Sequence, residues 1–76
     1  MPDPTTPERE LDRDEQARRV RAAIDALPDE QRTVVLLRLE QELSLEEIGA
    51  ITGAGRETVK SRLRYAMDKL RARLTP

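Results

Sequence analysis

The side chains best suited to binding chemistry lie close together in the stretch "RETVKSRLR", from Arg56 to Arg64. Arginine can donate two parallel hydrogen bonds to guanine or to a phosphate, and serine and threonine hydroxyls can serve either a base edge or a phosphate oxygen. Such donors indicate a surface that contacts a nucleic acid. We select seven candidate DNA-binding residues, which are Arg56, Glu57, Thr58, Lys60, Ser61, Arg62 and Arg64.

These candidates cannot all have the same role. Lys60, Arg62 and Arg64 cannot all face one way on a helix, so some of them are expected to contact the flanking phosphates and set the register. Glu57 could accept a hydrogen bond from cytosine or complement the positive end of a helix dipole, and we favour the second interpretation.

The charge of the chain is divided unequally. Residues 54–76 hold seven Lys/Arg against two Asp/Glu, a net charge of +5, whereas residues 1–53 hold seven against thirteen, a net charge of -6. A local basic field can meet a polyanion even in a chain whose total charge is -1. Charge alone is equally compatible with an ordinary solvated helix that balances an acidic remainder.

Composition excludes several other classes of function. The 76 residues suffice for one small domain and include no Cys or His, which removes disulfides, thiolate nucleophiles, imidazole bases and the usual zinc sites. We therefore expect no enzyme activity, no cofactor and no metal. No apolar run reaches the roughly 18 residues of a membrane span, so a cytoplasmic protein is expected. Tyr65, the single aromatic residue, is interpreted as a helix-packing residue.

The elements that must position these side chains are all helical. Start and stop signals predict an all-α fold, a small bundle of about four helices over residues 8–26, 29–41, 44–52 and 55–74. The segment "TVVLLRL" has strand propensity, but the preceding "PDEQR" is typical of a helix start. Residues 1–7, "MPDPTTP", are predicted to be a disordered tail or an interdomain linker, and residues 8–76 the folded domain.

Apolar residues recur at helical spacing in each predicted helix. The positions expected to face inward are Ala17, Val20, Ile24 and Leu27; then Val34 and Leu37, with Val35 and Leu39 less clearly assigned; then Leu45, Ile48 and Ile51; and finally Val59, Leu63, Met67 or Ala66, Leu70 and Leu74.

Residues 44–65 have the pattern of a helix-turn-helix. Ser44 and Glu47 match a capping box, Gly53 can end the first helix in the left-handed conformation, and Gly55 is a tolerable start for the second. Gly49 lies inside the first helix, where glycine costs about 1 kcal/mol relative to alanine. A close helix crossing would explain it, whereas in a plain helical hairpin it would be a mild defect.

The segment from Leu27 to Leu74 resembles region 4 of bacterial sigma factors, especially the extracytoplasmic-function (ECF) group. The matching pieces are "LP..QR.V..LR", "LS.EEI" and "TVKSRL..A...LR". The resemblance implies a winged-helix-like domain without a wing that binds the minus-35 promoter element through its last helix and acts in transcription initiation. It also implies docking on the β-subunit flap of core RNA polymerase and, in many members, inhibition by an anti-sigma factor.

Carried over by position, the resemblance places the seven candidates above in the DNA-reading segment, and it assigns polymerase contacts to Val35, Leu36, Leu39 and Leu43. We expect a monomer. Gly55 stands where the family often has Pro or Ser, which would loosen the start of the last helix. Region 2 has no counterpart, so we expect region 4 alone, with residues 1–26 including the end of a linker.

Two other functions fit the same pattern. A sigma-like decoy for an anti-sigma factor would use the acidic first half of the chain as its binding surface. A different helix-turn-helix regulator, such as a response-regulator output domain, would be expected to dimerise.

Overall fold

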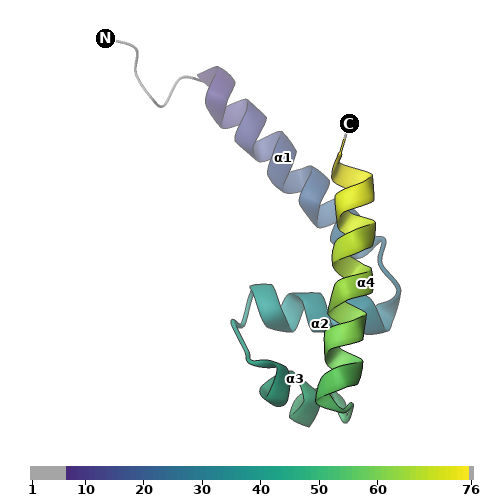
Figure 1. Ribbon diagram of the computed structural model, residues 1–76. Helices are drawn as coiled ribbons and strands as arrows, with labels where there is room; N and C mark the ends of the chain where they lie inside the picture. The colour runs from purple at the N-terminus through teal and green to yellow at the C-terminus, as the bar shows by residue number, and fades with distance from the viewer. Residues whose placement is uncertain (1–6, 76) are drawn as a thin grey trace.

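Four helices account for most of the chain in the computed structural model, which describes the backbone of residues 7–75 and the side chains of residues 13–75 (Figure 1). They are α1 (Pro7–Asp25), α2 (Asp29–Leu39), α3 (Leu45–Thr52) and α4 (Arg56–Leu74), and no strand occurs in this part of the chain. The predicted all-α fold and number of helices are confirmed. Apart from Pro7, which begins α1, the tail predicted for residues 1–7 lies outside the described residues.

The β-branched segment of α2 is helical because its flanks favour a helix. Pro28 precedes the first turn, and Asp29 and Glu30 lie at the positive end of the helix dipole. The helix ends at Leu39 rather than near Gln41 as predicted. The chain turns at Glu42, whose φ of 53° is left-handed and incompatible with a continuing helix.

Both ends of α3 are fixed by local interactions. The Ser44 hydroxyl accepts a hydrogen bond from the Glu47 amide at 3.1 Å, and the Glu47 carboxylate accepts one from the Ser44 amide at 3.1 Å, so the predicted capping box is present. Gly53 ends the helix with a φ of 74°, a conformation that glycine adopts without steric cost.

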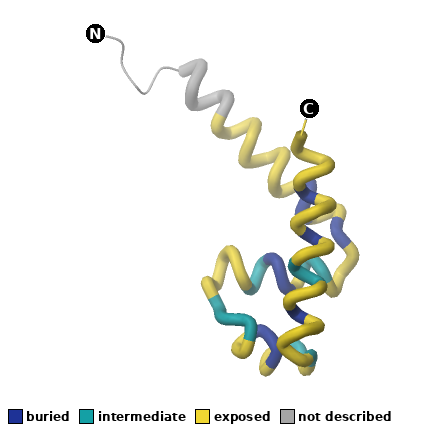
Figure 2. The backbone as a smooth tube through the Cα atoms, in the orientation of Figure 1, coloured by how far each residue is buried: buried dark blue, intermediate teal, exposed yellow. Residues whose placement is uncertain are grey.

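The core consists of two clusters of buried side chains that meet along α4 (Figure 2). The upper cluster joins α1, α2 and α4, and the lower cluster joins α2, α3 and α4. Leu63 packs against both. The buried members are Ala23, Ile24, Leu27, Val35, Ala66 and Leu70 in the upper cluster and Val34, Ile48 and Val59 in the lower cluster.

Several predictions about inward-facing residues need correction. Ala17 is exposed and Val20 is 40% exposed, because α1 diverges from α4 and only its last turns are covered (Figure 1). Ile51 is 62% exposed, since it lies near the end of the short α3 and lines an open depression with Glu30 and Arg62 instead of joining the core. Of the two alternatives in α4, Ala66 is buried and Met67 is exposed. Leu74, at the end of α4, and Leu39, at the end of α2, were also expected to face inward, but they are 39% and 55% exposed.

None of the helices in residues 7–75 combines the length and the apolar character needed to cross a bilayer.

Gly49 is required by a close backbone approach. A Cβ atom at this position would lie 2.7 Å from the carbonyl oxygen of Ala54, in the turn between α3 and α4. The predicted packing reason for this glycine is therefore confirmed, although the nearest atom belongs to the turn rather than to α4. Backbone cannot move aside as a flexible side chain can, so the turn would have to shift.

We predict that Gly49→Ala lowers the free energy of unfolding. Helix propensity alone would stabilise the variant by about 1 kcal/mol, whereas overpacking against fixed backbone costs about 1–3 kcal/mol. Urea denaturation followed by circular dichroism measures the net change. Gly55→Ala is the matched control because no atom lies within 4 Å of its Cβ position. A Gly49→Ala protein as stable as the wild type would contradict the steric explanation.

Candidate nucleic-acid interface

The orientation of α4 is set by one buried side of the helix. Val59 packs against Ile48 and Val34 near the start of α4, and Ala66 and Leu70 continue the buried side towards its end. The opposite side of α4 has no covering element in the described chain and is exposed along its length (Figure 2). The first half of α4 therefore presents an open surface directly after the α3–α4 turn.

Three polar residues form the centre of this open surface. They are Lys60, Ser61 and Arg64, and we call these three residues the outer face. All three side chains are exposed. Ser61 and Arg64 are three residues apart and therefore lie on neighbouring turns of one side of the helix. Lys60 and Arg64 form no ion pair with any described residue, so their donors are available to a ligand.

Two of the predicted arginines are instead paired with acidic residues of other helices. Arg56 Nε lies 3.1 Å from Glu46 Oε1 of α3, and both side chains are largely exposed, so this pair is weak and exchangeable. Arg62 Nη2 lies 3.5 Å from Glu30 Oε2 of α2, and the Arg62 side chain is only 27% exposed. The structure thus directs Arg62 towards α2 rather than towards the outer face.

The remaining candidates flank the outer face near the start of α4. Glu57 and Thr58 are exposed, and Glu57 lies in the first turn. This position favours a carboxylate through the helix dipole, in agreement with the interpretation preferred from the sequence.

The prediction that Tyr65 is a helix-packing residue is wrong. Its side chain is 63% exposed. It shares a shallow depression of about 260 Å³ with Ser61, Arg64 and Asp68. The signal that identifies it is positional: Tyr65 follows Ser61 by four residues and therefore lies on the same side of α4. Tyr65 joins the candidates for ligand contact.

The four residues assigned to polymerase contact differ in their accessibility. Val35 is fully buried in the upper cluster and offers no surface to a partner, which corrects that assignment. Leu36 and Leu43 are partly buried. Leu39 is 55% exposed and lines an apolar groove of about 370 Å³ between α1 and α4. The other apolar members of this groove are Val20, Ile24, Met67, Leu70 and Leu74.

Comparison with known proteins identifies relatives of this sequence. The family model "Sigma-70, region 4" matches residues 23–72. The RNA polymerase sigma factor SigV of Bacillus subtilis is 45% identical over 53 residues, which are 70% of this chain and 32% of SigV. FliA of Yersinia enterocolitica is 43% identical over 56 residues, and FliA of Escherichia coli K12 is 38% identical over 56 residues; each match covers 74% of this chain.

The chain therefore spans about a third or less of the length of these relatives, 32% of SigV and 24% and 23% of the two FliA proteins. The matches do not separate the ECF group from other sigma factors, so that part of the resemblance stays a prediction. The match to region 4 covers all of α2 and α3 and most of α4, including every residue of the outer face. The chain belongs to the sigma-70 region 4 family.

Proposed function

We propose that this domain recognises the minus-35 element of bacterial promoters as region 4 of a sigma factor, in the cytoplasm and as a monomer. The observation that carries the proposal is the outer face. Lys60, Ser61 and Arg64 are exposed on the helix that follows the helix-turn-helix turn, and neither cation is paired with a described residue. The N-terminal turns of such a helix enter the major groove in helix-turn-helix proteins.

The geometry suits a division between base contacts and phosphate contacts. Arg64 and Ser61 lie near the middle of the outer face, where a major groove would receive them, and arginine can bind guanine through two hydrogen bonds. Arg56 and Arg62 lie at other angles around α4, each beside a carboxylate of another helix. We assign these two arginines to the phosphates on either side of the groove. In the complex, the phosphates would replace the carboxylates as partners of the two arginines.

The first prediction from the proposed function is that the protein selects a defined sequence from a randomised duplex library. The enriched duplex should bind more tightly than a scrambled duplex of equal length. Log affinity should fall linearly with log salt concentration, with a slope of about -0.9 for each phosphate neutralised. Fluorescence anisotropy over a salt series measures both effects. Equal affinity for the two duplexes, or no dependence on salt, would rule out the proposal.

If the protein does not bind DNA, the two alternative functions can be tested. If the protein binds no duplex but still captures an anti-sigma factor, the decoy function is favoured. Light scattering checks the expected monomer, and a dimer would instead support a different class of helix-turn-helix regulator.

The second prediction ranks two arginines. Arg64→Ala should weaken binding to the enriched duplex by about 1–3 kcal/mol and relax specificity at one base pair, since a base contact is lost. Arg62→Ala should cost less and affect all duplexes alike, because Arg62 already has Glu30 as a partner and would contact a phosphate. Anisotropy on single-base variants of the duplex distinguishes the two patterns.

The matched control for this ranking is Arg71→Ala. This substitution removes the same charge from the same helix. Arg71, however, lies two turns beyond Arg64 and is paired with Asp68, with Nη1 and Oδ1 3.7 Å apart. A loss of affinity in Arg71→Ala as large as that in Arg64→Ala would show that only the total charge of α4 matters.

We further propose that the apolar groove around Leu39 receives the β-subunit flap of RNA polymerase. Leu39, Met67 and Val20 are among the most exposed large apolar side chains of the described chain, and all three line this one groove. Apolar side chains gathered in one depression are typical of a protein–protein contact. The groove lies by the second half of α4, so it leaves the outer face free for DNA.

The third prediction is that Leu39→Glu weakens binding to an isolated β-subunit flap by about tenfold or more, since loss of a central apolar contact commonly costs over 1 kcal/mol. Affinity for the enriched duplex should change little. Ile51→Glu is the matched control because Ile51 is an apolar residue on α3 of similar exposure, 62% against 55% for Leu39, and lies away from the groove. Surface plasmon resonance measures flap binding. If Ile51→Glu reduces it as much as Leu39→Glu does, the groove is not the docking site.

A further inference from the structure

One ion pair joins α4 to α2 from a partly buried position. Arg62 Nη2 lies 3.5 Å from Glu30 Oε2, and the Arg62 side chain, at 27% exposed, is the least exposed of the cations that form ion pairs among the described residues. Arg62 lines a depression of about 360 Å³ between α2, α3 and α4, which we call the Arg62 depression. Its other lining residues are Asp29, Glu30, Thr33, Ile51 and Thr52.

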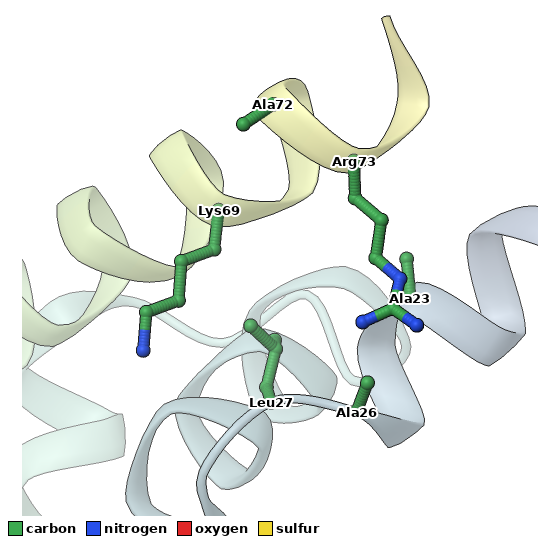
Figure 3. Close-up of a pocket in the computed structure, with 6 residues that line it drawn as sticks. All are labelled: Ala23, Ala26, Leu27, Lys69, Ala72 and Arg73. Carbon is green, nitrogen blue, oxygen red and sulfur yellow. The ribbon is translucent and has the colours of Figure 1, made fainter.

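Carboxylates do not accompany every cation of α4. Figure 3 shows Lys69 and Arg73 at a different depression, beside the end of α1, and no carboxylate is among the residues that line it. Neither cation forms an ion pair with a residue among 13–75. The pairing of Arg62 with Glu30 is therefore a particular feature of this part of α4 and does not follow from the acidic composition of the chain alone.

Neither the contact between α2 and α4 nor the position of Glu30 requires this ion pair. Val34 and Val35 of α2 pack against α4 and have no exposed surface. Glu30 lies in the first turn of α2, where the helix dipole favours a carboxylate without a cationic partner. At 3.5 Å the two groups attract each other without a short hydrogen bond, and the Glu30 side chain is 75% exposed. Such a pair exchanges readily with another anion.

We propose that Glu30 sets the affinity of this domain for polyanions by competing with phosphate for Arg62. In the free protein, the carboxylate holds the guanidinium at the Arg62 depression. Arg62 directly follows Ser61 of the outer face, so a change of side-chain rotamer brings the guanidinium to the edge of that face, where a phosphate would bind it. Each complex with a polyanion then loses the attraction between Arg62 and Glu30, which lowers the affinity for every duplex.

The alternative role for Glu30 is to orient Arg62 for its ligand, and the Arg62 depression disfavours it. Asp29 and Glu30 both line this depression, and the hydroxyl groups of Thr33 and Thr52 already donate hydrogen bonds to backbone carbonyls at 2.8 Å. A phosphate that approached Arg62 in its present position would meet two carboxylates, and like charges placed together are unfavourable. Arg62 must therefore leave Glu30 in order to bind phosphate.

The test compares Glu30→Gln with Asp29→Asn as its matched control. Both changes remove one negative charge from the first turn of α2 at the same depression. Asp29, however, pairs with Arg32 at 2.6 Å, and Arg32 keeps its hydrogen bond to the carbonyl of Asp25 when that pair is lost. Glu30→Gln should raise the affinity for the enriched and the scrambled duplex by the same factor, about two- to fivefold at low salt. Asp29→Asn should raise it less.

The deciding measurement repeats Glu30→Gln in a protein that carries Arg62→Ala. Without Arg62 there is no guanidinium to release, so the gain should fall to that of Asp29→Asn. Fluorescence anisotropy measures the affinities, and circular dichroism checks that each variant is folded. Equal gains with and without Arg62 would show a general charge effect and overturn the inference. A loss of affinity in Glu30→Gln would also overturn it, because Glu30 would then position Arg62 for the ligand.

This inference rests on the phosphate contact proposed above for Arg62, but its failure is distinguishable from failure of the proposed function. If the two duplexes bind equally well, promoter recognition is ruled out, and the gain that depends on Arg62 is still measured on either duplex. If no duplex binds, the same variants are titrated with heparin, a sulfated polyanion. A gain in heparin affinity that depends on Arg62 supports the inference, and the absence of that gain overturns it.

Discussion

The whole arrangement depends on the contact of Val34, Ile48 and Val59, which join α2, α3 and α4 and have no exposed surface. This contact fixes the angle at which α4 leaves the turn. The angle is possible only because Gly49 lets the carbonyl of Ala54 approach where a Cβ would lie at 2.7 Å. A small core can maintain one precise crossing when its side chains are aliphatic and rotamerically restricted, as these β-branched residues are.

From this crossing follows the division of α4 into two halves that pack against different parts of the core. The first half rests on the lower cluster and has its outer face uncovered, whereas the second half rests on α1 through Ala66 and Leu70. The apolar groove around Leu39 lies beside that second contact. A single helix of 19 residues thus joins the two clusters, and Leu63 packs against both.

Local chemistry made most of this fold predictable from the sequence. The capping box of Ser44 and the left-handed Gly53 depend only on near neighbours, so their patterns determine them directly. Periodicity was less informative where a helix is short or diverges from its neighbour. It places Ile51 and Ala17 on an apolar side but cannot say where the covering helix ends. The partners of a long side chain, such as Glu30 for Arg62, depend on tertiary geometry and were likewise not predictable.

The same geometry explains how a chain of net charge -1 can present a surface for a polyanion. The acidic residues beside α4 are not spread evenly, since Glu46 and Glu30 lie in the first turns of α3 and α2, where helix dipoles stabilise them, and pair with Arg56 and Arg62. Lys60 and Arg64 between them have no acidic partner among the described residues. A near-neutral total weakens long-range attraction to any polyanion. Under the proposed function, discrimination between DNA sequences would come mainly from contacts of this short, uncompensated face.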